Sequence, residues 1–155
     1  MEKITIKRIT LQDIELVVEL FDQYRIFYKQ QSNLEVARAF ILDRLRQNES
    51  VIFVAISEES NRPVGFTQLY PTFSSMRVAK NWILNDLYVV LDARKMGIGR
   101  KLILEAMHFA KTENATFLKL STAVDNFTAQ QLYESMGFVR LDVNEEFYDY
   151  KILLS

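Results

Sequence analysis

The chain of 155 residues contains no cysteine, one histidine, two prolines and four glycines. Without cysteine there is no disulfide framework, no thiolate metal site and no cysteine nucleophile. No apolar run approaches the roughly 20 residues that cross a membrane, and the first residues lack the apolar stretch of a signal peptide. The sequence therefore predicts a cytoplasmic protein with no membrane partner and no metal site.

Charge is also nearly balanced, with 19 lysine and arginine residues against 20 aspartate and glutamate residues. A net charge of −1 gives no overall field that would favour nucleic acid or a membrane surface, so neither is expected as a partner. The hydrophobic content of 49% is ordinary for a globular protein, and the length fits one domain. We therefore predict a single domain over residues 1–155.

The hydrophobic pattern predicts an α/β protein with the element order β-α-α-β-β-β-α-β-α-β-β. Because a helix connects the strand at 82–90 to the strand at 117–122, these two strands should be parallel. The strand at 82–90 is the most apolar and is predicted to be central. The expected strands are 4–9, 51–56, 64–70, 82–90, 117–122, 138–143 and 147–153, and the expected helices are 11–28, 34–48, 98–113 and 128–136.

Several residues mark where these elements should begin or end. Thr10 is expected to cap the first helix, and Ser32 starts a capping-box pattern before the second. Pro71 is expected to close the third strand, with a polar loop over 72–78. Gly137 stands where a left-handed helix cap is expected.

Two of the four glycines, Gly97 and Gly99, lie between a predicted strand and a predicted helix. Glycines there let a ligand approach the backbone, and the first N–H groups of the helix have no intrahelical partner, so the turn suits a diphosphate. The alternative is a turn whose glycines only relieve crowding. A dinucleotide-binding fingerprint would need a third glycine where Leu102 stands, which disfavours an oxidoreductase of that kind. Arg94, Lys95, Arg100 and Lys101 add positive charge around the turn.

Residues 94–99 (Arg-Lys-Met-Gly-Ile-Gly) resemble the Arg/Gln-x-x-Gly-x-Gly/Ala motif of the GCN5-related N-acetyltransferases (GNAT). Residues 84–89 (Leu-Asn-Asp-Leu-Tyr-Val) look like the central strand of that family. Residues 126–138 resemble its Asn-x-x-Ala-x-x-Leu-Tyr-x-x-x-Gly-Phe segment, in the family's order. The resemblance implies a single-domain GNAT fold: a mixed, mostly antiparallel sheet with a splayed central parallel strand pair and flanking helices.

The resemblance also implies acetyl-CoA as co-substrate. Backbone groups after Asp86 would bind the pantetheine arm, and the amides of the glycine turn would hold the pyrophosphate. Asn126 would touch the cofactor arm through its side chain, or cap the helix that follows it, or both. The implied cofactor-binding residues are Leu87, Tyr88, Val89, Arg94, Lys95, Met96, Gly97, Ile98, Gly99, Arg100 and Asn126.

The resemblance places Tyr133 beside the departing sulfur, where a hydroxyl with a pKa of about 10 can donate a proton or a hydrogen bond. The alternative is a tyrosine packed in the core. An alkylamine with a pKa of about 10.4 must lose a proton before it attacks, and Asp86 is the first candidate base. The alternatives are that Asp86 faces solvent or pairs with a basic residue. Asn85 stands where polyamine-acetylating relatives carry an acid, and His108 is read as a partly exposed helix residue.

Aromatic side chains near carboxylates suit a cationic amine, and Tyr24, Phe27 and Tyr28 lie near Asp22 in the sequence. Tyr24, Tyr28 and Asn85 are the predicted substrate residues; the alternative for the aromatics is a core stripe. The loop at 72–80 and the acidic residues Glu145, Glu146 and Asp149 are further candidates for the acceptor cleft.

The sequence thus predicts an N-acetyltransferase acting directly, in a ternary complex, on a small polyamine-like or amino-acid amine. The alternative is a catalytically silent acyl-CoA-binding regulatory module. The last predicted strand, 147–153, offers an edge for pairing with a second chain, so a homodimer is one expected assembly.

Overall fold

The computed structural model describes residues 3–141, 148, 150 and 152–154. The chain divides into two compact units, Met1–Ser121 and Thr122–Ser155, and each is described here by itself. Within the described residues, no helix combines the length and apolar character that a membrane crossing requires. The first unit contains one sheet, whose strands in spatial order are β1 (Ile4–Arg8), β2 (Val51–Ser57), β3 (Arg62–Ser74), β4 (Ala79–Val89) and β5 (Leu118–Leu120).

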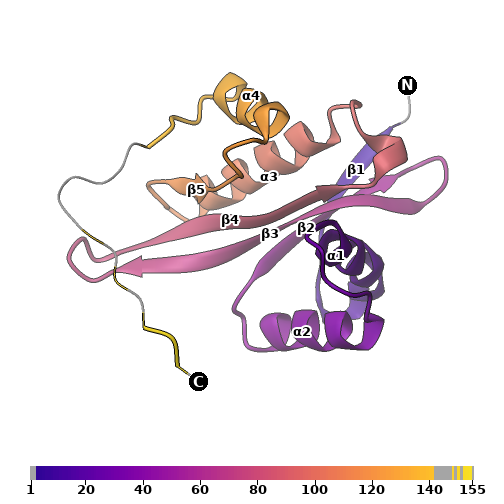
Figure 1. The fold of residues 1–155 in the computed structure, drawn as a ribbon, viewed down its shortest axis with the longest axis horizontal. Helices are drawn as coiled ribbons and strands as arrows, with labels where there is room; N and C mark the ends of the chain where they lie inside the picture. Colours follow the sequence, from indigo (N-terminus) through magenta and orange to yellow (C-terminus); the bar gives the residue numbers. More distant parts are fainter. Residues whose placement is uncertain (1–2, 142–147, 149, 151, 155) are drawn as a thin grey trace. The chain divides into compact units, whose positions relative to one another are not determined.

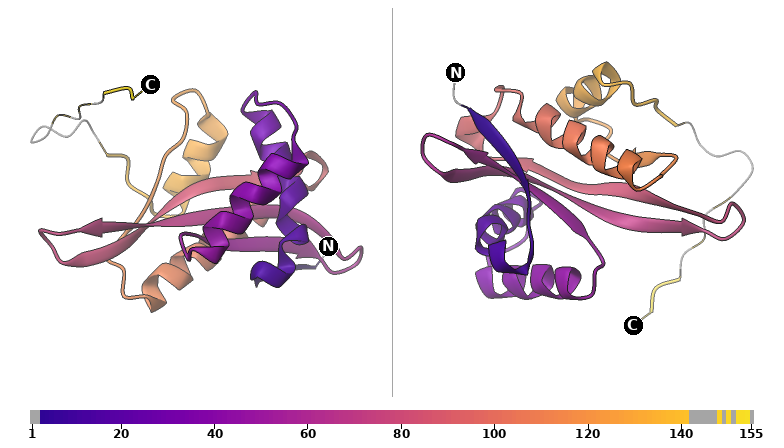
Figure 2. Two further views of the ribbon diagram at one scale, coloured as in Figure 1. Left: turned by 90° about the horizontal axis from the view of Figure 1, so that it is seen from below. Right: turned by 180° about the vertical axis from the view of Figure 1, so that it is seen from behind.

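Helices cover both faces of this sheet in the first unit (Figures 1 and 2). The pair α1 (Glu15–Phe27) and α2 (Leu34–Arg46) lies on one face, and α3 (Ile98–Thr112) lies on the other. β2 is buried along almost its whole length, as expected for a strand covered on both sides. The predicted inner face of α3 is confirmed, because the following residues are all buried: Ile98, Leu102, Ala106 and Phe109.

The sheet is mixed, as predicted. Its first four strands pair antiparallel, and β4 and β5 pair parallel through the α3 crossover. The parallel pairing ends at Leu84 and Leu120, so Asn85–Val89 has no strand on that side within the described residues. This is the splayed strand pair that the resemblance implied.

β4 is an inner strand of the described sheet, between β3 and β5, and with β5 it forms the predicted parallel pair. The strands predicted at 138–143 and 147–153 fall partly outside the described residues, and their described parts contain no strand.

The end predicted for the third strand is wrong, since β3 continues through Pro71 to Ser74. Pairing with β2 stops at Leu69, while Pro71 still lies opposite Trp82 of β4. From there on β3 is an edge strand, where a proline without an N–H is tolerated. The expected loop therefore shrinks to the turn 75–78, and the β3–β4 hairpin extends past the helices of the first unit (Figure 2).

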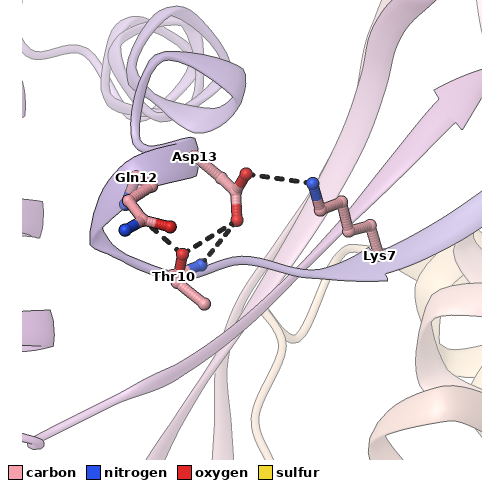
Figure 3. Close-up of polar contacts among 4 residues, drawn as sticks. All are labelled: Lys7, Thr10, Gln12 and Asp13. Carbon is pink, nitrogen blue, oxygen red and sulfur yellow. Dashed lines mark hydrogen bonds and ion pairs between the residues drawn. The ribbon is translucent and has the colours of Figure 1, made fainter.

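The first helix starts with a short 3-10 turn, Leu11–Asp13, before α1 begins. Thr10 caps it as predicted: its Oγ1 accepts from the Gln12 N–H at 3.3 Å, and the Asp13 carboxylate accepts from the Thr10 N–H at 2.9 Å (Figure 3). Lys7 of β1 donates to the same carboxylate at 2.9 Å. The Thr10 backbone bond first, and then Lys7, lower the pKa of Asp13.

The second helix begins where predicted, but its cap is Asn33 rather than Ser32. The Asn33 Oδ1 accepts from the Val36 N–H at 3.1 Å, whereas the Ser32 hydroxyl donates to Asp22 at 2.6 Å. Asp22 is buried and needs donors, so it takes the hydroxyl that the pattern assigned to capping.

Candidate active site

The N-terminus of α3 forms an exposed, uncapped turn at the end of β4. Gly97 occupies the cap position with φ 77° and ψ 13°, a left-handed conformation that strains a residue carrying a Cβ. Within the described part of the chain no side chain caps this helix, and its first turn holds no acidic residue. The nearby Asp92 is paired with Arg62 at 3.0 Å, and that partner lowers the pKa of Asp92. The turn therefore suits an anionic group bound by backbone amides.

Arg94 braces this turn against the end of β4. Its Nε donates to the carbonyl oxygen of Val89 at 2.9 Å, and its guanidinium lies 5.7 Å from the ring centroids of Phe27 and Tyr88. Lys95, the next residue, has a positive φ of 67° in the same tight bend. The backbone amides, rather than the Arg94 side chain, are thus the groups best suited to phosphate oxygens.

The strand that leads to the turn carries a β-bulge. Gln68 pairs with Asp86 and Leu69 with Leu84, which leaves Asn85 as the extra residue on β4. Bulges redirect side chains and often lie beside active sites. The residues after the bulge pair with β3 but not with β5, so part of their backbone faces the splayed side: Leu87, Tyr88 and Val89.

Asp86 lies next to this bulge and is only 5% exposed. Gln68 Nε2 donates to its Oδ2 at 2.8 Å, and Asn85 Nδ2 donates to its Oδ1 at 3.0 Å. Tyr24 of α1 forms a further hydrogen bond with the carboxylate. The expected alternatives, a solvent-facing Asp86 or one paired with a basic residue, do not describe this arrangement, because Asp86 is buried and these three partners are neutral.

Two tyrosines next to Asp86 are held in their neutral form. Burial, followed by the hydrogen bond and charge of Asp86, raises the pKa of Tyr24 well above its usual range. Burial, followed by the same charge, raises the pKa of Tyr70 to about 12. The Tyr24 ring lies 5.0 Å from Tyr28 and 6.5 Å from Tyr88. The structure thus brings together the predicted residues Tyr24, Tyr28, Asn85 and Asp86.

Asp22, by contrast, does not belong to this group of side chains. It is 4% exposed, and its two oxygens accept from the Ser32 hydroxyl at 2.6 Å and the Asn33 N–H at 2.8 Å. The carboxylate beside the aromatic group is therefore Asp86. The predicted acidic cluster of Glu145, Glu146 and Asp149 lies outside the described residues.

The second unit contains α4 (Phe127–Ser135). Asn126 caps it, with its Oδ1 accepting from the Ala129 N–H at 3.1 Å, which confirms the capping role. Gly137 has the expected left-handed backbone, φ 98°, and ends the helix. Tyr133 is half-buried, with its ring centroid 6.2 Å from that of Phe138. The proposed contacts of Asn126 and Tyr133 with acetyl-CoA remain predictions.

Sequence reasoning missed three residues that the structure places at this site. Gln68 and Tyr70 contact or face Asp86, and a Cβ on Gly65 would lie 2.9 Å from the Tyr88 carbonyl oxygen. The available signal was the polar residue inside the apolar run 64–70, since a buried glutamine needs partners.

His108 is exposed on α3, and no group of three or more metal-ligating side chains occurs among the described residues.

Comparisons with known proteins agree with this geometry. The acetyltransferase (GNAT) family matches residues 14–138. The uncharacterized N-acetyltransferase YhfO of Bacillus subtilis is 44% identical over 133 residues, 86% of this chain and 88% of YhfO. A probable acetyltransferase of Haemophilus influenzae is 32% identical over 137 residues, 88% of this chain and 90% of the relative. The crystal structure of a probable acetyltransferase, 41% identical, has a TM-score of 0.87 and covers 97% of this chain and 98% of its own. The chain therefore belongs to the GNAT family of acetyltransferases and is an acyltransferase enzyme.

Proposed function

We propose that this enzyme transfers an acetyl group from acetyl-CoA directly to a primary amine bound in the same complex. One observation carries the proposal: β4 contains the buried Asp86, and the short connection after β4, with the 3-10 turn Leu91–Ala93, leads to the uncapped N-terminus of α3. A proton acceptor and an anion-binding turn thus belong to one stretch of chain. Without cysteine, no acetyl group can be held on an enzyme sulfur, which favours direct transfer.

The amides of Lys95 to Arg100 would hold the pyrophosphate, and the splayed backbone of Leu87 to Val89 would bind the pantetheine arm. Acetyl-CoA would supply an activated thioester. The aminoglycoside N-acetyltransferase AAC(6')-Iy, which shares the fold at 16% identity with a TM-score of 0.77, was solved in complex with CoA. That likeness supports CoA as the ligand of this turn. Asn126 would add its side-chain amide to the cofactor arm.

Asp86 would take the proton that the amine must lose before it attacks. Its buried position and its three neutral partners hold the carboxylate in one orientation. Tyr133 would donate a proton or a hydrogen bond to the departing sulfur. Both roles require the amine, the thioester and these two side chains to be held at defined positions. Holding them together in one complex supplies much of the expected rate acceleration.

The acceptor is proposed to be a small amine, either an amino-acid amine or a polyamine-like one. Tyr28 is 56% exposed and stacks edge-on against Tyr24, which bonds the Asp86 carboxylate. An exposed aromatic face beside a carboxylate suits an ammonium group. The D-amino-acid N-acetyltransferase HPA3 of Saccharomyces cerevisiae is 28% identical over 138 residues, which supports including amino acids among the candidate acceptors.

The test combines binding and turnover. Isothermal titration with acetyl-CoA measures cofactor binding, and thiol release across a panel of amino acids, polyamines and basic peptides measures transfer. Mass spectrometry then identifies which amine has gained one acetyl group. Amine-dependent thiol release is expected; binding without release for any amine would instead indicate an acyl-CoA-binding regulatory module.

A further inference from the structure

The hydrogen bonding of Gln68, in the middle of β3, is incomplete. The side chain is fully buried, and its Nε2 donates to Asp86 Oδ2 at 2.8 Å. Its Oε1 is also buried, yet it has no hydrogen-bond partner among the described residues. A buried carbonyl oxygen without a donor is costly, and native proteins rarely leave one unsatisfied. This atom therefore calls for a donor from a molecule that binds beside Asp86.

The surroundings of Oε1 define the chemistry of that donor. Asn85 and Tyr24 already direct their hydrogen bonds to the Asp86 carboxylate. An anion is disfavoured next to that carboxylate, whereas the N–H groups of a cation are attracted by it and by the carbonyl oxygen together. A protonated amine meets both requirements.

We propose that Gln68 is a substrate-binding residue whose Oε1 accepts one N–H of the acceptor amine while its Nε2 holds Asp86 in place. The inference rests on the proposed function and assigns a residue that selects primary amines within it. Gln68 thus contacts the base and the attacking nitrogen at once.

The fate of the hydrogens on the amine nitrogen explains why a contact with Gln68 Oε1 would favour primary over secondary amines. A primary ammonium has three N–H hydrogens, and one passes to Asp86 before the nitrogen attacks. A second leaves as the C–N bond forms and the C–S bond breaks, and the thiol product carries it. The third stays on the amide, and it is the hydrogen that Oε1 holds throughout. A secondary ammonium has only two, so it must give up this contact during transfer.

The experiment compares each primary amine with its N-methyl derivative, using alanine with N-methylalanine and putrescine with N,N′-dimethylputrescine. Gln68→Met removes the acceptor at similar volume. It should lower kcat/KM for both amines, because Asp86 also loses its Nε2 donor, but by about a further tenfold for the primary amine, so that the discrimination between them shrinks. Acetyl-CoA affinity should stay within about twofold of the wild-type value, since no contact with the turn changes.

Two further variants make the outcome decisive. Gln68→Glu keeps an acceptor oxygen, and because two carboxyl groups this close share one proton, it can still hydrogen-bond Asp86; it should keep the discrimination even if its rate falls. Trp82→Phe removes the Trp82 ring nitrogen, which is buried and has no hydrogen-bond partner in the part of the chain that the structure describes. The Trp82 ring packs against Phe109 of α3, and this variant should leave the discrimination and the amine KM unchanged. Unchanged discrimination in Gln68→Met, or its loss in Gln68→Glu, would overturn the assignment of Gln68. If the wild-type enzyme releases no thiol with any amine, the proposed function fails, and this inference fails with it.

Discussion

A buried carboxylate can serve as a base only if the protein replaces the water that it has lost. At Asp86 this is done by Gln68, Asn85 and Tyr24, which come from β3, β4 and α1. Each partner is neutral, so these side chains hold the carboxylate by hydrogen bonds and not by an ion pair. The residues that matter most for chemistry here are therefore those that orient Asp86 as well as Asp86 itself.

Replacing the base gives the most direct prediction at this scale. Asp86→Asn should reduce kcat/KM for the amine by about 10²- to 10⁴-fold, because the attacking nitrogen keeps its proton. Thiol-release rates measured over a range of amine concentrations, at saturating acetyl-CoA, check this. Asp43→Asn, which changes an exposed carboxylate on α2, is the matched control. A variant with the wild-type rate would mean that another group accepts the proton.

Tyr133 is tested by removing only its hydroxyl. In Tyr133→Phe the ring contact with Phe138 is retained, so the fold of the second unit should persist. If the hydroxyl assists the departing sulfur, kcat should fall by about a hundredfold while acetyl-CoA affinity changes little. Steady-state kinetics and calorimetric titration separate the two effects. An unchanged turnover number would remove Tyr133 from the mechanism.

At the scale of elements, the turn at the start of α3 is not crowded by the protein itself. A Cβ built on Gly97 meets no atom within 4 Å, so the protein itself leaves room for a side chain. What disfavours a larger residue there is the positive φ of this position and the space that a bound ligand would need. Asparagine tolerates positive φ, whereas glutamate adds both strain and a negative charge. Gly97→Asn should therefore fold and keep measurable acetyl-CoA binding, while Gly97→Glu should lose it. Isothermal titration and melting temperature report the two effects, and wild-type affinity in Gly97→Glu would refute the phosphate turn.

The connection between α1 and α2 depends on Asp22. Both of its oxygens accept hydrogen bonds, at 2.6 Å and 2.8 Å, and an asparagine amide nitrogen cannot accept. Asp22→Asn should lower the free energy of unfolding by about 1–3 kcal/mol, measured in urea. Ser32→Ala removes only one donor and should have the smaller effect. Equal stability of Asp22→Asn and the wild type would show that these bonds contribute nothing net.

How much the sequence predicted also differs between elements. The face of α3 and the parallel β4–β5 pair were predictable, because periodicity records burial and a helical crossover dictates strand direction. The extent of β3 was not, because whether Pro71 ends a strand depends on where the neighbouring β2 stops. The cap of α2 was misassigned for a similar reason, since the Ser32 hydroxyl donates to the carboxylate of Asp22, ten residues earlier in the chain. Asp86 could be predicted from its motif, whereas the apolar run 64–70 indicates only that Gln68 is buried and needs a partner, and not which one, because that partner lies on another strand.

For the whole molecule, the question is whether the two units unfold together. The second unit, Thr122–Ser155, is shorter than the roughly 40 residues below which a domain usually needs disulfides or a metal, and the chain has no cysteine. Its helix α4 contains no buried residue, so α4 supplies no buried apolar side chain to a core of this unit. The GNAT match, residues 14–138, also runs across the division.

We therefore expect the chain to unfold as one cooperative domain, as its length predicts. Differential scanning calorimetry should give a single transition whose calorimetric and van't Hoff enthalpies agree. Acetyl-CoA should move that transition to higher temperature, because a ligand that binds only the native state stabilises it by mass action. Gly97→Glu should lose this shift while retaining the single transition. Two separate transitions, or an acetyl-CoA shift confined to one of them, would show that the units fold independently.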